Sequence, residues 1–326
     1  MPKINVRING EIIDPKSYST DLKYFDIYIE FLKNFSESFL KIHEIEPEIN
    51  LVEYGTLGNE LCLDSRLKVK LIKDFKTHLN NLFGIALYSS GTHADMLKRA
   101  YKDHKILYIC LRETHDLNII RTTLHEFYHL IDPFKLIEFQ TIINGSSTYI
   151  KFKDYIKCNI RLCLNEYHAS LRSYQFILQT FLKQKRKNQE VYLEVLIFRS
   201  KSHLSGLENK LSRKLKELKK ERLSDYKVQY KLLRYFMEDF MVPNFYFFGE
   251  WRAFRIESIN DSELKQAWNQ FHSKINNKLI FNLLEKMKHE LLREDKGEYE
   301  SFAQKFDNYF TNFFNELILL FNNYIK

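Results

Sequence analysis

Apolar residues recur at spacings of three and four from Asp116 to Ile131, which predicts a helix with one buried face. Thr114 or Asp116 can cap its amino end, because short polar side chains accept hydrogen bonds from the first free backbone N–H groups. Pro133 ends the helix, since a proline disfavours helical geometry in the residue before it, here Asp132. The predicted buried stripe consists of Leu117, Ile120, Leu124, Phe127 and Ile131.

Shorter runs elsewhere have the composition of β-strands. Lys105–Leu111 and residues 83–88 are rich in β-branched and aromatic side chains and predict two strands. Near the amino end, alternating polar and apolar residues flank Asn9-Gly10, a pair typical of the tight turn between two antiparallel strands. The sequence therefore predicts a hairpin at the start of the chain.

Helical spacing dominates the second half of the chain. Residues 165–174 predict a helix, and residues 299–324 place phenylalanines and leucines on one helical face. Residues 207–235 combine regularly spaced leucines with lysine and arginine, which predicts a long amphipathic helix. Residues 241–251 predict an aromatic-rich break between helices, which either walls a cleft or forms core beneath a long turn.

Composition supports a mostly helical protein with a substantial core. Only 9 glycines and 5 prolines occur in 326 residues, of which 44% are hydrophobic. Because glycine and proline form most tight turns, their scarcity favours long helices over extensive sheet. The expected fold class is mainly α with a small β-sheet, an α+β protein.

Charge and cysteine content restrict the partners and the compartment. A net charge of +8 gives a mild attraction to acidic partners, but lysines on a solvated helix face explain it better than nucleic-acid binding. The four cysteines, which form no C-x-x-C pair, are expected to be reduced and buried: Cys62, Cys110, Cys158 and Cys163. The sequence has neither a signal-peptide pattern nor an apolar run of about 18 residues. We expect no membrane span and a cytoplasmic location, or export by a route that needs no signal peptide.

The predicted helix 116–131 carries an H-E-x-x-H motif. On a helix, His125 and His129 project from one face a turn apart, whereas Glu126 points about 100° away around the axis. Two imidazoles so placed can bind one zinc ion, and the neighbouring carboxylate can act as a base on a metal-activated water. A chain of this composition would contain the motif by chance roughly three times in a hundred, the alternative being two surface histidines on an ordinary helix.

A catalytic zinc ion requires a third protein ligand. The downstream candidates are Asp132, Glu138, Glu166 and His168. Glu166 is favoured because small residues share its side of the predicted helix 165–174, which would let that helix approach the histidine helix closely: Ala169, Ser170 and Ser173.

The segment Asn165-Glu166-Tyr167-His168-Ala169, 37 residues after His129, resembles the third-ligand helix of the glutamate-zincin metallopeptidases. The resemblance covers residues 80–175, and within the group the chain is most similar to compact intracellular bacterial and phage H-E-x-x-H domains. It implies one Zn²⁺ held by His125, His129 and Glu166, Glu126 as general base, and a polypeptide substrate. It also implies a zincin-like catalytic region over residues 1–175. The helical pattern downstream predicts a large helical part over residues 176–326, packed on the first or forming a second subdomain.

In zincins, a strand before the active-site helix forms the sheet edge to which an extended substrate adds by main-chain hydrogen bonds. By resemblance, this edge would consist of Ile106, Leu107, Tyr108, Ile109, Cys110 and Leu111.

Further site residues are less well specified. The candidates for stabilising the oxyanion are Tyr128, Tyr167, His168 and Tyr174, although ordinary packing is the commoner role of aromatic residues on core helices. Asp132 could instead accept a hydrogen bond from a metal-binding histidine, or cap the end of the helix.

Two functions follow from these patterns. The first is a zinc-dependent peptidase that hydrolyses peptide bonds with a metal-activated water. The second is a non-catalytic helical binding or regulatory protein that retains a metal site and uses its basic helices to bind a protein or a nucleic acid. An intact Glu126 favours the first, because a purely structural zinc site needs no base.

Overall fold

A computed structural model describes residues 3–67, 73–87, 105–112, 116–131, 152–182 and 242–258, together with residues 213, 262, 265 and 266. The chain forms two compact units, Met1–Ile150 (unit 1) and Lys151–Lys326 (unit 2). The sequence predicted the boundary after residue 175, whereas the two units meet after Ile150. The helix that carries Glu166 therefore belongs to unit 2.

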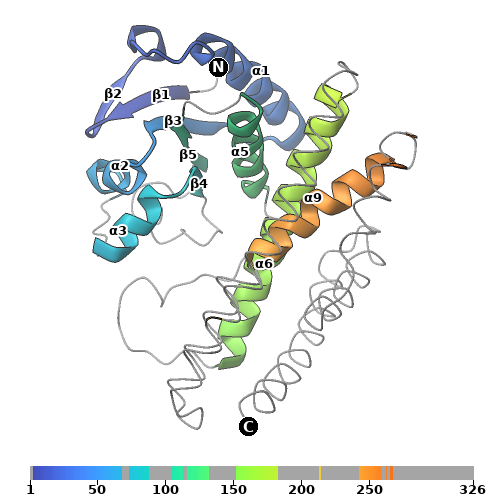
Figure 1. Cartoon of the computed structure of the whole chain (residues 1–326). Coiled ribbons are helices and arrows are strands. Elements are labelled where there is room, and N and C mark those ends of the chain that lie inside the picture. The colour runs from blue at the N-terminus through green and yellow to red at the C-terminus, as the bar shows by residue number, and fades with distance from the viewer. Residues whose placement is uncertain are drawn as a thin grey trace. The chain divides into compact units, whose positions relative to one another are not determined.

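Unit 1 is built on a five-stranded sheet with the strand order β2-β1-β3-β5-β4 (Figure 1). The strands are β1 (Lys3–Ile8), β2 (Glu11–Ile13), β3 (Pro47–Glu53), β4 (Gly84–Leu87) and β5 (Lys105–Leu111). β1, β3 and β5 are parallel, whereas β2 and β4 run antiparallel to their neighbours. Helices combined with this small sheet confirm the α+β expectation.

The predicted hairpin at the amino end is confirmed. Asn9 and Gly10 adopt positive φ angles of 52° and 84°, as the tight turn between β1 and β2 requires. The buried carboxylate of Glu60 accepts hydrogen bonds from the backbone N–H groups of Asn9 and Gly10, at 2.7 and 3.0 Å. A turn that the local sequence favours is thus fixed by a residue 50 positions later.

Helices cover both faces of the sheet (Figure 1). α1 (Phe25–His43) and α5 (Asp116–His129) lie on one face, and α2 (Leu57–Leu63) and α3 (Lys73–Asn80) lie on the other. The core between α2, α3 and the sheet consists of Val52, Leu57, Leu61, Leu67, Leu79, Ile85, Leu87, Ile106, Tyr108 and Cys110. The sequence-predicted helix and strand at 116–131 and 105–111 correspond to α5 and β5.

Aromatic packing fixes α5 against α1. Phe127 lies edge-on to Phe35 and Phe39, with ring centroids 5.0 and 5.2 Å apart. The hydroxyls of Tyr28 and Thr123 form a buried hydrogen bond of 2.6 Å one turn earlier in α5. Because Phe127 lies between the two histidines of the motif, this packing also fixes the rotation of the helix that carries them.

A buried polar network crosses the sheet beside α2. Arg7 and Arg66 form ion pairs of 3.0 and 2.6 Å with Asp64, and Tyr108 donates a 2.6 Å hydrogen bond to the same carboxylate. Asn50 accepts a 2.7 Å hydrogen bond from Arg7. Breaking such a network leaves a charge buried without a partner, which typically costs about 3–5 kcal/mol.

The network predicts a loss of stability in acid. Burial alone would raise the pKa of Asp64, but hydrogen bonds from Arg66 and Tyr108 and the charge of Arg7 hold that pKa below its usual value. The stabilisation is therefore present above the unfolded-state pKa of about 3.9 and is lost as the pH falls through the folded-state pKa. Urea titrations should show the free energy of unfolding decreasing below about pH 4. Asp64→Asn should weaken this dependence; an unchanged slope in that variant would exclude Asp64 as its source.

In the described part of unit 2, two helices pack together. α6 (Phe152–Ile177), which continues as a π-helical turn at Leu178–Leu182, packs along α9 (Val242–Ser258). A Cβ added at Gly249 would clash with the Tyr167 carbonyl oxygen and lie 2.7 Å from the Ser170 Cβ. Glycine thus lets the two backbones approach closely, and the small residue Ser170, expected to face the histidine helix, accommodates α9.

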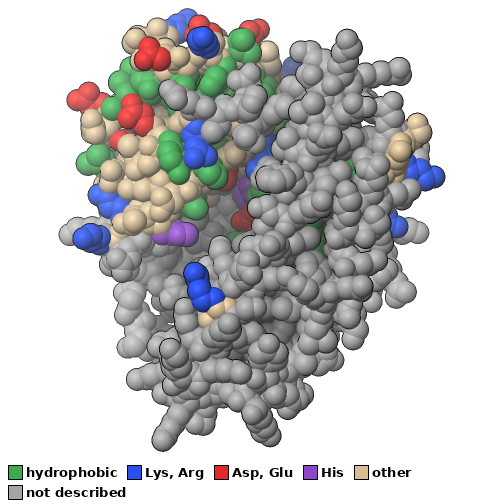
Figure 2. All heavy atoms as spheres, viewed as in Figure 1, with side chains coloured by type: hydrophobic (Ala, Val, Ile, Leu, Met, Phe, Trp, Pro, Cys, Tyr) green, Lys and Arg blue, Asp and Glu red, His purple; other side chains and the backbone are tan. Residues whose placement is uncertain are grey.

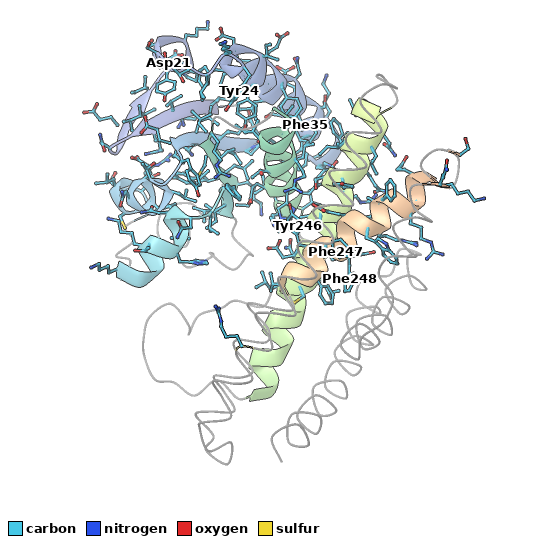
Figure 3. The ribbon with its side chains drawn as sticks, in the orientation of Figure 1. Asp21, Tyr24, Phe35, Tyr246, Phe247 and Phe248 are labelled. Atoms are coloured by element: carbon cyan, nitrogen blue, oxygen red, sulfur yellow. The ribbon has the colours of Figure 1, made fainter. Side chains whose placement is uncertain are left out.

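The aromatic break expected at residues 241–251 is wrong, because this stretch forms most of α9. Pro243 is compatible with the helix because it stands in the first turn, where its missing N–H needs no partner. Phe245, Phe248 and Trp251 are buried, so these aromatic residues form core, the second of the two roles considered. Figure 3 shows the side chain of Phe248 on α9.

The two helices predicted at 207–235 and 299–324 lie outside the described residues. Within the described part, no helix combines the length and the apolar character needed to cross a membrane. Figure 2 shows acidic and basic side chains interspersed on the visible face of unit 1, with no extended patch of one sign.

Candidate metal centre

The last two turns of α5 bring the two motif histidines together. The Nε2 atoms of His125 and His129 lie 2.8 Å apart, and their rings are perpendicular with centroids 4.4 Å apart. His125 is buried and His129 is half-buried. The helical spacing therefore directs both nitrogens to one point, as the sequence predicted.

This geometry is close to that of a zinc-binding pair. Two bonds of about 2.05 Å at a tetrahedral angle separate their nitrogens by about 3.3 Å. The observed 2.8 Å needs to widen by roughly half an ångström, a small rotation of either ring. The spacing of the two nitrogens is thus compatible with binding one metal ion after little rearrangement.

Glu126 lies on a different side of α5, against the sheet. A Cβ at Gly84 would lie only 3.0 Å from the Glu126 Cγ and 3.1 Å from the Tyr108 carbonyl oxygen. Glu126 is only 9% exposed, so its position depends on the space that Gly84 leaves. The sequence motif identifies the carboxylate, but Gly84 is a site residue that sequence reasoning missed.

We expect Gly84→Ala to impair the site without unfolding the protein. The added methyl group must displace Glu126 by a few tenths of an ångström, because the Tyr108 backbone cannot move away easily. If Glu126 acts as a base, such a displacement should lower kcat/KM on the order of 10- to 100-fold while the zinc content stays the same. Ala86→Gly, on the same strand, is the matched control and should retain activity. Full activity in Gly84→Ala would show that the position of Glu126 is not critical.

The negative charge of Glu126 affects a cysteine in the sheet, Cys110. Burial, and next the negative charge of Glu126, raise the pKa of the Cys110 thiol to about 12. Cys110 is consequently a neutral thiol at physiological pH. The expectation of buried, reduced cysteines is confirmed for Cys110 and Cys163, which are free and buried, whereas Cys62 is free but only half-buried. The side chain of Cys158 lies outside the described residues.

The third candidate ligand, Glu166, lies on α6 and is half-buried. Its negative charge, after burial itself, raises the pKa of Cys163, which lies on the same helix. His125 and His129 belong to unit 1 and Glu166 to unit 2, and their joint binding of a metal ion stays a prediction. Two imidazoles and one carboxylate are a donor set that suits a catalytic zinc ion, with a fourth position left for water.

The remaining candidates have mixed outcomes. Tyr128 packs against Phe39, with ring centroids 6.1 Å apart, which is the packing role considered for it. Tyr174 and His168 are buried on α6. Asp132 and Glu138 lie outside the described residues.

The prediction that β5 is an edge strand is wrong. β5 is not an edge, because it pairs with β3 on one side and with β4 on the other. Nearly all of its side chains are buried, as befits an inner strand. Among the described strands, the edge beside α5 is β4, which contacts α5 and begins at the glycine that makes room for Glu126.

Comparisons of the chain with protein-family models, curated proteins and solved structures give no match. The residues and geometry of the site are therefore the basis for the function proposed below.

Proposed function

We propose that the chain is a zinc-dependent peptidase of the glutamate-zincin type, in which His125, His129 and Glu166 bind one zinc ion. The observation that supports this most is the convergence of the two imidazole nitrogens, 2.8 Å apart, with a buried carboxylate one residue away on another side of the helix. A structural zinc site would close with a fourth protein ligand and would have no use for this base.

Bound zinc would polarise the substrate carbonyl and lower the pKa of its water toward about 7. Glu126 then accepts the proton of the attacking water and delivers it to the leaving amine, because an uncoordinated carboxylate can serve as base and acid in turn. Its burial beside Gly84 holds the carboxylate in one orientation for both transfers. The chain's own residues thus supply metal binding, proton transfer and positioning.

We further propose that the substrate adds to β4 rather than to β5. An extended peptide beside Gly84–Leu87 can form main-chain hydrogen bonds with this strand, the strand-addition mode of recognition. Since Gly84 contacts Glu126, a peptide in this register passes directly in front of the proposed base. Side-chain selectivity then depends on the surfaces that flank β4.

Removal and restoration of the metal test the proposed activity. Treatment with a zinc chelator should abolish cleavage of an unfolded protein substrate such as casein, and stoichiometric zinc should restore it. Because the histidine pair is already nearly in place, circular dichroism should show that the apoprotein stays folded. Hydrolysis that persists after complete metal removal would contradict the proposal.

A further inference from the structure

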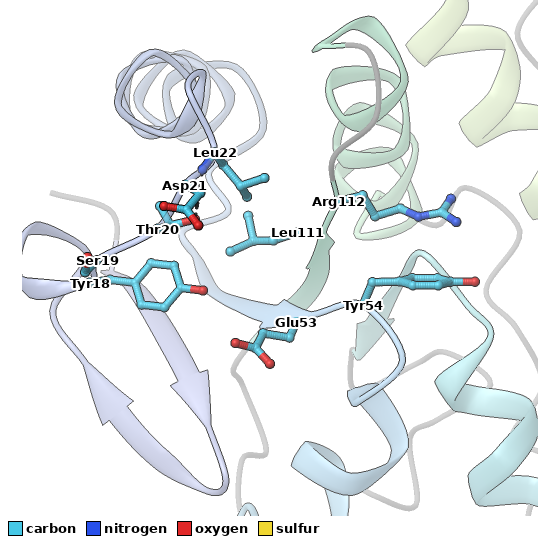
Figure 4. A pocket seen from close by; sticks show the side chains of 9 residues that line it. All are labelled: Tyr18, Ser19, Thr20, Asp21, Leu22, Glu53, Tyr54, Leu111 and Arg112. Atoms are coloured by element: carbon cyan, nitrogen blue, oxygen red, sulfur yellow. Dashed lines mark hydrogen bonds between the residues drawn. The ribbon is translucent and has the colours of Figure 1, made fainter.

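A hollow separate from the candidate metal centre lies in unit 1 at the carboxyl ends of β3 and β5 (Figure 4). It has a volume of about 590 Å³ and is lined by residues 18–22 together with the residues that end the two strands. None of the proposed metal ligands and neither Glu126 nor Gly84 lines it. We call it the strand-end groove.

The topology of the sheet favours a ligand site at this place. The chain leaves β3 toward α2 on one face of the sheet and leaves β5 toward α5 on the other (Figure 1). Where neighbouring parallel strands connect to opposite faces, a crevice opens beyond their carboxyl ends, and ligands bind there. The volume lies within the range of about 300–1,000 Å³ typical of small-ligand sites.

One end of the groove is acidic. Asp21 and Glu53 are exposed there, and no described lysine or arginine forms an ion pair with either. Burial and the charge of Glu53 raise the pKa of Tyr18, which reflects the negative potential. Thr20 holds the loop in place by accepting a 3.2 Å hydrogen bond from the Leu22 backbone. This end can receive a cationic group.

The other end presents an arginine held by aromatic rings. The Arg112 guanidinium carbon lies 4.0 Å from the ring centroids of both Tyr54 and Phe83, which are themselves stacked 5.9 Å apart. Stacking occupies the face of the guanidinium and leaves its N–H edge able to bind a carboxylate through two hydrogen bonds. No carboxylate in the described part of the chain pairs with Arg112.

We propose that the strand-end groove binds a short peptide of two or three residues, with its free amino group at Asp21 and Glu53 and its free carboxylate at Arg112. A ligand with a single charge would leave the other end of the groove unmatched, whereas a zwitterion satisfies both. Leu22 and Leu111 provide an apolar surface for the peptide between the two ends (Figure 4). The strand-end groove is separate from the metal site, and peptide binding there does not depend on peptidase activity.

Calorimetry with trialanine as the probe tests this site. The full-length chain carrying Glu126→Gln is used, so that hydrolysis cannot alter the probe. Trialanine should bind saturably, and blocking both of its termini as N-acetyl-trialanine amide should weaken binding at least about tenfold, since each terminus makes a charged hydrogen bond. Equal affinity for the free and the blocked peptide, or no saturable binding of trialanine at millimolar concentrations, would overturn the proposal.

Substitutions in the groove assign the two ends. Arg112→Gln and the double variant Asp21→Asn/Glu53→Gln should each weaken trialanine binding about tenfold or more, whereas Glu37→Gln on the exposed face of α1 should not. N-acetyl-trialanine, which keeps only its carboxylate, should remain sensitive to Arg112→Gln and become insensitive to the acidic double variant. The opposite pattern, or equal losses in every variant, would contradict the assigned orientation.

Discussion

Glu126→Gln is expected to abolish peptide hydrolysis while zinc remains bound. The amide keeps the shape of the side chain in the space beside Gly84 but cannot accept a proton from water. Loss of a general base typically lowers the rate about 10²- to 10⁴-fold, whereas the metal ligands stay intact. Cleavage assays and metal analysis on the same preparation measure the two quantities separately.

Glu30→Gln, an exposed residue of α1, is the matched control for this experiment and should behave like the wild type. Proteome-wide mapping of cleavage sites with wild type and Glu126→Gln should also identify the substrate, since only the wild type should generate new peptide termini. If Glu126→Gln retained hydrolysis, Glu126 would have no part in the mechanism.

Glu166→Ala is expected to produce the second large effect, a loss of zinc affinity. Removing partners that only support a ligand typically lowers affinity about 10- to 100-fold, so removal of a ligand itself should exceed about 100-fold. Competition titrations with a zinc-binding dye measure this loss. Arg172→Ala, an exposed residue of the same helix, should leave the affinity unchanged.

The same titrations separate the alternatives for the third ligand. Should Glu166→Ala bind zinc as tightly as the wild type, Glu166 would not be a ligand. Asp132→Ala and His168→Ala would then show whether Asp132 or His168 replaces it.

Local patterns in the sequence identified what local forces determine. The spacing of apolar residues predicted α5 because one face of that helix is buried against α1 and the sheet. The Asn9-Gly10 pair predicted the hairpin because few other residues accept two successive positive φ angles. The motif histidines were predictable for the same reason, since helical spacing alone brings their nitrogens together.

Contacts between distant segments explain what the sequence did not predict. The resemblance to zincins predicted that β5 is an edge strand, and no local signal in the sequence tells that β4 pairs with its outer side. Gly84 precedes Glu126 by 42 residues, so its role is visible only once the strand and helix are packed. The strand-end groove likewise joins residues from three separate segments that meet only where parallel strands end.

The most direct test of the account is the zinc content of the purified wild type and of the double variant His125→Ala/His129→Ala, measured by mass spectrometry after growth with ample zinc. The account predicts one zinc ion per wild-type chain and none in the variant, with both proteins folded. A wild type without stoichiometric metal, or a variant that keeps the same zinc content, would contradict it.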